Sequence, residues 1–203
     1  FPADGAGFTQ PGDDDPALAG EDQFNGYFKI IIQGALQNVN GSNFLVYYPM
    51  ILTHCPFTPT PGSADWDPES PGSKTYKGDS GYFGDMVHHM DKVIGRIVTR
   101  LEENGLRENT IILFTGDNGT DPWAESRVDG TRVRGQKGLL TEAGTRVPLI
   151  VYWKGRVEGG GVDEGLTDLS DLYPTLADAS GTPVPPGAVF GTWGRSNSPY
   201  QIN

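Results

Sequence analysis

The amino-acid sequence predicts an α/β fold with a mainly parallel sheet flanked by helices. Short continuous apolar runs, typical of strands buried on both faces, occur at residues 44–48, 110–115 and 147–153. Segments whose apolar residues recur every three or four positions, typical of amphipathic helices, alternate with these runs. The resulting order of helix, strand, helix, strand, strand and helix favours parallel strands joined by right-handed crossovers.

The N-terminal part predicts a lead-in followed by one helix. Residues 1–21 are rich in Gly, Pro, Asp and Ala, which predicts a flexible or extended segment. Apolar residues then recur with helical spacing from Phe24 to Val39, and Asn-Gly-Ser at 40–42 ends this helix. The apolar run at 44–48 follows as the first predicted strand.

The clearest predicted element is a helix over residues 83–101. Asp79 or Ser80 can cap its start, and Gly105 stands where a glycine commonly ends a helix. Its apolar positions are Phe83, Met86, Val87, Met90, Val93, Ile94, Ile97, Val98 and Leu101.

The C-terminal part predicts two strands and a last short helix. The runs at 110–115 and 147–153 are the strands, and a long polar loop separates them. A helix over residues 169–177 follows, with Asp168 as its candidate cap.

Length and composition limit the classes of partner. The 203 residues suffice for one domain, expected over residues 22–181 with a tail at 182–203. A net charge of −11 argues against nucleic acid, so any anion site must be a local cluster of cations. Cys55 is the single cysteine, so no internal disulfide can form, and no apolar run is long enough to span a membrane. No signal peptide is visible and the sequence begins at Phe1, so a processed or partial chain is expected.

Two long polar loops, at 49–79 and 116–146, leave the carboxyl ends of predicted strands. His54 comes six residues after the first strand, and Asp117 and Asn118 come directly after the second. Ligands of parallel α/β sheets bind beyond the carboxyl ends of the strands. These three side chains are therefore expected at the same edge of the sheet.

Asp117 and Asn118 are the candidate metal ligands. A carboxylate and an amide oxygen side by side at the end of a rigid strand can bind a hard cation. Asp-Asn-Gly is also common turn chemistry, so a plain turn at 117–119 is the alternative.

Lys137 is the candidate anion ligand. It lies in Gly-Gln-Lys-Gly at 135–138, where the glycines allow a close approach of the backbone to a ligand. A solvated loop lysine is the alternative. The same loop is locally basic within an acidic chain, which favours an anion pocket, and its other cations are Arg127, Arg132, Arg134 and Arg146.

His54 is the candidate proton donor, with a surface histidine as the alternative. His88 and His89 are adjacent on the predicted helix and point about 100° apart, so they are assigned structural or solvent roles. Cys55 precedes a proline, and no basic residue follows within fifteen positions to lower its pKa. A buried bystander is therefore favoured over a nucleophile.

Taken together, these segments resemble the sulfatase family over roughly residues 22–195. The collinear motifs are Phe-Leu-Val-Tyr-Tyr-Pro-Met-Ile-Leu-Thr-His-Cys-Pro-Phe-Thr-Pro-Thr-Pro at 44–61, Met-Asp-Lys-Val-Ile-Gly-Arg at 90–96, Leu-Arg-Glu-Asn-Thr-Ile-Ile-Leu-Phe-Thr-Gly-Asp-Asn-Gly at 106–119, Gly-Gln-Lys-Gly at 135–138, Glu-Ala-Gly-Thr-Arg-Val-Pro-Leu-Ile-Val at 142–151 and Asp-Leu-Ser-Asp-Leu-Tyr-Pro-Thr-Leu at 168–176. Each motif is weak alone, whereas all of them in order are specific.

The resemblance implies an alkaline-phosphatase-like fold and the hydrolysis of sulfate esters, sulfated glycans being the most plausible class. In that family four side chains hold a Ca²⁺ ion, the last two being an Asp-Asn pair that Asp117 and Asn118 match. Lys137 matches the late sulfate-binding lysine, and His54 matches a histidine that contacts the sulfate and helps to protonate the leaving oxygen. By the same resemblance the compartment is periplasmic, secreted or lysosomal, although the residues themselves leave it open.

The sequence departs from the family pattern at the nucleophile. Sulfatases use a formylglycine made from a Cys or Ser in a Cys-x-Pro-Ser-Arg type motif, whereas Cys55 is followed by Pro-Phe-Thr-Pro. We therefore expect a partial chain that lacks the N-terminal half, is inactive alone, and needs that half or a partner chain to complete its fold. The alternatives are a phosphate or phosphonate ester hydrolase of the same superfamily and a non-catalytic fragment that binds a metal or a sulfated glycan. Substrate specificity is expected from loops such as 58–78 and 120–134.

Overall fold

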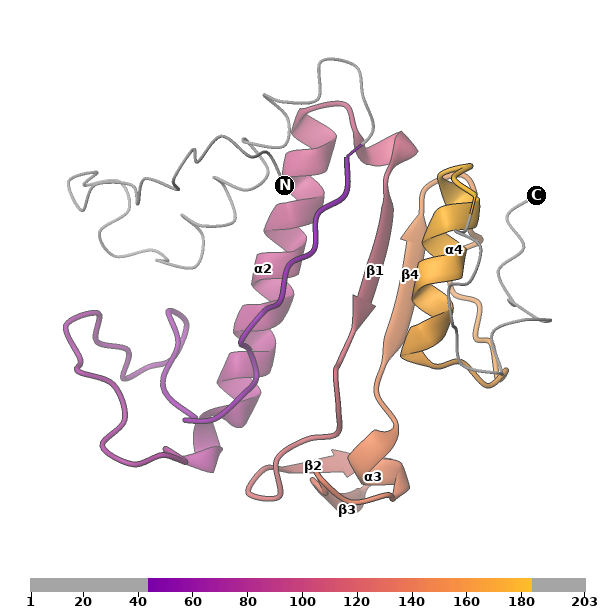
Figure 1. Ribbon diagram of the computed structural model, residues 1–203. Coiled ribbons are helices and arrows are strands. Elements are labelled where there is room, and N and C mark those ends of the chain that lie inside the picture. The colour runs from indigo at the N-terminus through magenta and orange to yellow at the C-terminus, as the bar shows by residue number, and fades with distance from the viewer. Residues whose placement is uncertain (1–43, 184–203) are drawn as a thin grey trace, which may run out of the picture. The chain divides into compact units, whose positions relative to one another are not determined.

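The computed structural model describes residues 44–183 (Figure 1). They form two compact units, one made of residues 44–104 and 115–148 and the other of residues 105–114 and 149–183. The predicted lead-in and the helix over 24–39 lie outside the described residues, as does all but the start of the predicted tail.

A long helix, α2 (Phe83–Glu103), dominates the first unit. It follows a short 3-10 turn, η1 (Ser80–Tyr82), in which the Asp79 side chain accepts a hydrogen bond from the backbone N–H of Gly81. The helix buries four side chains of one stripe, namely Met86, His89, Val93 and Leu101. The predicted helix is thus confirmed, and the predicted cap is Asp79 acting on the turn that precedes it.

The first unit has a small apolar core beside this helix. Cys55, Phe57, Met86 and Ala124 are buried together, with Phe83 packed against them. The rings of Phe57 and Phe83 meet edge to face with centroids 5.8 Å apart. Full burial of a side chain such as Phe57 contributes on the order of 2–3 kcal/mol, so this core fastens the segment after His54 to the helix.

The strand predicted at 44–48 is wrong. These residues carry no regular secondary structure, and Leu45 and Tyr47 are 77% and 84% exposed. A strand needs a hydrogen-bonded neighbour, and no strand of the described residues pairs with this segment. Apolar composition alone therefore does not make it a strand here.

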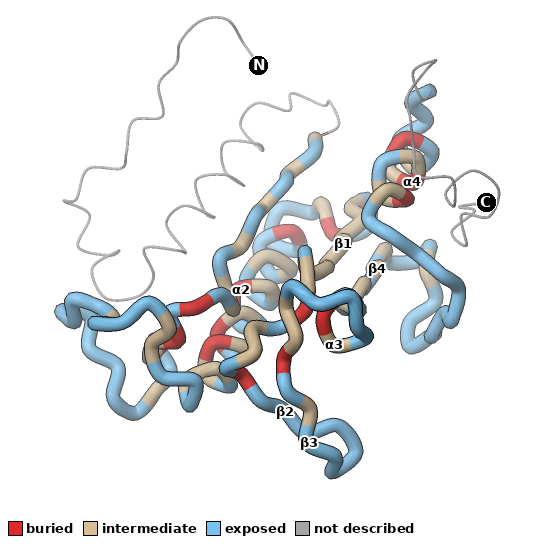
Figure 2. The backbone as a smooth tube through the Cα atoms, turned by 60° about the horizontal axis from the view of Figure 1, so that its bottom comes forward, coloured by how far each residue is buried: buried red, intermediate tan, exposed pale blue. Residues whose placement is uncertain are grey.

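The long polar loop predicted at 116–146 contains two strands and a helical turn. Strands β2 (Glu125–Val128) and β3 (Thr131–Arg134) form an antiparallel hairpin, most of which is exposed (Figure 2). Asp129 and Gly130 make its turn with φ values of 49° and 77°, the left-handed geometry that suits a two-residue hairpin loop. A single helical turn, α3 (Glu142–Thr145), follows.

The second unit pairs β1 (Ile111–Thr115) with β4 (Leu149–Trp153) in a two-stranded sheet. A capping box of Asp168 and Asp171 begins η3 (Leu169–Asp171), which leads into α4 (Leu172–Ala179) and confirms the last predicted helix. The guanidinium of Arg107 stacks 3.7 Å from the ring centroid of Tyr152.

The α/β class is confirmed, but neither sheet of the described residues is parallel. The arrows of β1 and β4 run in opposite directions in Figure 1. A parallel pair needs a long crossover connection, usually a helix. The chain between β1 and β4 holds only a hairpin and the single turn α3, so β4 returns antiparallel. Within residues 44–183, no helix combines the length and the apolar character needed to cross a membrane.

Candidate functional site

Asp117 and Asn118 lie in a tight turn directly after β1. The backbone N–H of Gly119 donates to the carbonyl oxygen of Gly144 in the segment of α3 at 2.9 Å, and this contact buries Gly119. Asp117 is exposed and Asn118 is half-buried. Neither side chain has a hydrogen bond or ion pair with any residue in the range 44–183. Both side-chain oxygens are therefore available to a ligand.

Backbone pairing holds Lys137 close to this turn. The N–H of Lys137 donates to the carbonyl oxygen of Thr120 at 2.9 Å, and the N–H of Gly135 donates to that of Ala124 at 3.1 Å. The bond of Gly135 keeps the register of the hairpin, whereas that of Lys137 joins the loop after the hairpin to the segment before it. Lys137, which is half-buried, is thus fixed beside a residue only three positions after Asp117.

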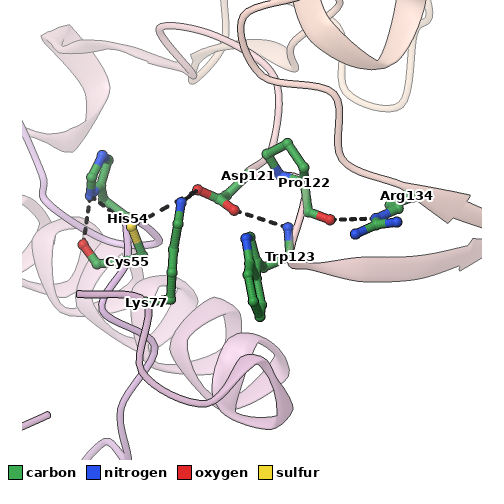
Figure 3. Close-up of polar contacts among 7 residues, drawn as sticks. All are labelled: His54, Cys55, Lys77, Asp121, Pro122, Trp123 and Arg134. Atoms are coloured by element: carbon green, nitrogen blue, oxygen red, sulfur yellow. Dashed lines mark hydrogen bonds and ion pairs between the residues drawn. The ribbon is translucent and has the colours of Figure 1, made fainter. Parts of the chain in front are cut away.

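His54 lies on the segment that the apolar core holds. Its backbone N–H donates to the carbonyl oxygen of Ile51 at 2.8 Å, and its Nδ1 lies 2.7 Å from the carbonyl oxygen of Cys55 (Figure 3). Because a carbonyl oxygen can only accept, this contact assigns the hydrogen to Nδ1. The other ring nitrogen, Nε2, then takes up or releases the second proton of the ring.

Asp121 connects these segments, and sequence reasoning missed it. Its Oδ2 lies 2.6 Å from Lys77 Nζ and 3.9 Å from Cys55 Sγ, and its Oδ1 accepts from the N–H of Trp123 at 2.9 Å (Figure 3). The Asp121 side chain is 14% exposed. The ion pair of Lys77 and Asp121 therefore ties the loop that follows His54 to the base of the hairpin.

The surroundings of Lys77 and Asp121 favour the charged form of both side chains. Burial by itself would raise the pKa of Asp121, but the hydrogen bonds from Lys77 and Trp123 and the nearby charge of Lys137 together hold it below its usual value. The hydrogen bond to Asp121 raises the pKa of Lys77. Lys77 and Asp121 are 44 positions apart, so no local spacing could have linked them.

The structure thus groups the predicted site residues in two ways. Backbone bonds place Lys137 beside the turn of Asp117 and Asn118. His54 approaches the same loop through its neighbour Cys55, which contacts Asp121, and not through the expected edge of a parallel sheet. No hydrogen bond or ion pair joins these predicted residues directly to one another in the part of the chain that the structure describes.

Cys55 is buried, as expected of a bystander. It belongs to the apolar core, and its sulfur lies 3.9 Å from Oδ2 of Asp121, the oxygen that also lies 2.6 Å from Lys77 Nζ. Among residues 44–183, no three His, Cys, Asp or Glu side chains are grouped so that they could hold a metal ion. Asp117 and Asn118 are thus two oxygen donors of an incomplete set.

Known proteins that are similar to this chain come from one family. The sulfatase family model matches residues 18–182. The chain is 38% identical to an arylsulfatase of Hemicentrotus pulcherrimus over 111 residues, which cover 54% of this chain and 20% of that protein. It is 32% identical to human arylsulfatase A over 143 residues, covering 70% of this chain and 26% of the relative.

A solved sulfatase, PsFucS1 from Pseudoalteromonas sp., aligns with a TM-score of 0.42 and 35% identity, covering 54% of this chain and 24% of that one. The chain spans about a fifth to a quarter of the length of the two arylsulfatases. The family model itself covers most of the chain, from residue 18 to residue 182. This chain belongs to the sulfatase family.

Proposed function

We propose that this chain supplies one side of the calcium and sulfate site of a sulfuric ester hydrolase with an alkaline-phosphatase-like fold and a mainly parallel sheet. The observation that carries the proposal is the backbone bond from Lys137 to Thr120, which fixes the lysine to a residue three positions after Asp117. The side chains of Asp117 and Asn118 have no hydrogen bond or ion pair within residues 44–183. Membership of the sulfatase family supports the same reading.

Asp117 and Asn118 would hold the Ca²⁺ ion. A carboxylate and an amide oxygen are ligands that suit this hard cation, and neither side chain has a hydrogen bond or ion pair within residues 44–183. Calcium takes about six to eight oxygen ligands, so further ligands must come from outside this pair. When bound, the cation offsets the negative charge of the non-bridging sulfate oxygens.

Lys137 and His54 would act on the sulfate ester itself. The ammonium group of Lys137 is a compact positive charge suited to a sulfate oxygen. His54 donates its Nδ1 hydrogen to the carbonyl of Cys55, so in the imidazolium form Nε2 carries the proton that the leaving oxygen needs. Lys77 and Asp121 hold the two loops that carry these groups.

The nucleophile of the reaction is not Cys55, which lies in the apolar core beside the carboxylate of Asp121. A formylglycine made elsewhere in the protein would fill that role. The gene sequence on the 5′ side of the Phe1 codon tests this part of the proposal. A Cys/Ser-x-Pro-x-Arg motif there supports a hydrolase, and its absence contradicts one.

A calcium titration followed by NMR tests the site in the 203-residue chain. We expect CaCl2 to shift the amide signals of residues 117–119, and we expect Asp117→Asn to remove these shifts because it loses the charged ligand. Asp91→Asn is the matched control, since Asp91 is an exposed acid on α2. Shifts that persist in Asp117→Asn, or that never occur at residues 117–119, contradict the calcium assignment.

A further inference from the structure

The β2–β3 hairpin presents its charged side chains on one face. Its register sets Glu125 opposite Arg134 and Arg127 opposite Arg132. Residues opposite one another in an antiparallel pair share a face, as do residues two apart on a strand. Glu125, Arg127, Arg132 and Arg134 therefore lie on the same side, which we call the arginine face.

One carboxylate does not balance three guanidinium groups. Arg132 forms a two-pronged ion pair with Glu125, and this contact lowers the pKa of Glu125 and keeps it charged. Arg134 donates through Nε to the carbonyl oxygen of Pro122 at 2.6 Å. Arg127 contacts only a neutral acceptor, the carbonyl of Gly130 at 3.4 Å, within the described residues.

The position of Arg127 is electrostatically unfavourable without an anion. It stands directly across the ladder from Arg132, and like charges in that relation destabilise a hairpin. A hollow of about 190 Å³ lies at this point, lined by Glu125, Ser126, Arg127 and Arg132. An oxyanion seated between the two arginines would turn their repulsion into attraction.

The base of the hairpin is the candidate site. Asp121 and Lys137 flank the two strands. The bond from Gly135 to Ala124 extends the hairpin by one pair, and the backbone N–H of Lys137 donates to the carbonyl oxygen of Thr120. Arg132 comes five residues before Lys137, so at about 3.3 Å per residue their Cα atoms are at most about 17 Å apart even if the chain between them is extended. An extended ligand bound at Lys137 can therefore reach the arginine face.

We propose that the arginine face binds a second sulfate group of a multiply sulfated oligosaccharide whose scissile sulfate lies at Lys137. This inference rests on the proposed function and names its substrate class. The guanidinium fork matches the paired oxygens of a sulfate. A net charge of −11 repels a long polyanion, so a short oligosaccharide that meets only this local positive face is the better fit.

The test compares two disaccharides with the same backbone, one with a single sulfate and one with a sulfate on each ring. Their affinities for the 203-residue chain are measured by calorimetry or NMR. We expect the disulfated sugar to bind more tightly to the wild type. Arg127→Gln should reduce that preference by about three- to fivefold, as for a partly exposed ion pair, and Arg127→Glu should abolish it.

Controls separate misfolding from loss of the site. Arg127→Glu places opposite charges across the ladder, so its melting temperature should match or exceed that of the wild type. Arg100→Gln removes an exposed arginine from α2 and should leave the preference for the disulfated sugar unchanged. Equal preference in the wild type and Arg127→Glu overturns the proposal.

Lys137→Ala distinguishes this inference from the proposed function. If that variant binds the monosulfated sugar as well as the wild type does, the sulfate role of Lys137 fails. If Lys137→Ala loses binding of the monosulfated sugar while Arg127→Glu keeps the full preference for two sulfates, the sulfate role of Lys137 is supported and the role of the arginine face is contradicted.

Discussion

A single methyl group at Gly119 would disturb the turn that carries Asp117 and Asn118. A Cβ atom there would lie 2.7 Å from the Cα and 2.8 Å from the carbonyl carbon of Gly144, and it would overlap the carbonyl oxygen of Ala143. Carbon atoms pack best at about 3.5–4.0 Å, so the turn and α3 must separate by roughly 1 Å. Overpacking of this kind costs about 1–3 kcal/mol.

Two measurements follow from that displacement. At roughly 2–4 °C per kcal/mol, Gly119→Ala should melt about 3–10 °C below the wild type in a thermal scan. Because a misplacement of about 1 Å weakens a built site by up to about a hundredfold, we expect its calcium-dependent amide shifts to need at least about tenfold more CaCl2. Both effects should appear in the same purified protein.

Gly95→Ala is the matched control, because a Cβ at this position on α2 meets no atom within 4 Å. Removing a glycine from a helix interior should stabilise the chain by about 0.5–1 kcal/mol and leave the calcium titration unchanged. If Gly119→Ala has the melting temperature of the wild type and needs the same CaCl2 concentration for its amide shifts, the turn does not depend on this close approach.

Three further outcomes are expected. Phe57→Ala should lower stability by about 3–5 kcal/mol in denaturant titrations, because Phe57 is 1% exposed in the core; a loss below about 1 kcal/mol would contradict that packing. Asp121→Asn should melt below the wild type at neutral pH. The folded-state pKa of Asp121 is depressed, so its stabilisation is present above the ordinary value of 3.8 and lost as the pH falls through the folded value; the two melting curves should converge in acid and diverge towards neutrality. Lys77→Met should displace both the segment of His54 and the segment of Lys137, so NMR amide shifts are expected in both. Shifts confined to the neighbours of Lys77 would contradict the proposal that this ion pair links the two loops.

Local patterns determined several features of this protein. The helical periodicity of residues 83–101 specified α2 because its apolar stripe is a property of contiguous residues. Asp129-Gly130 likewise encodes the hairpin turn, because this dipeptide is a local signal for a two-residue hairpin loop. The motifs around Asp117 and Lys137 identified the family for the same reason, since each motif is a short run of neighbours.

Other features depended on the tertiary structure. The antiparallel return of β4 follows from a connection too poor in helix to cross over, and the apolar run at 44–48 is no strand because no described strand pairs with it. The ion pair of Lys77 and Asp121 joins residues 44 positions apart through the paths of two irregular loops. The sequence alone determined which residue types the site contains, whereas only the fold decided which of them are in contact. The physical reason is that residues distant in sequence come together only when the backbone between them has folded.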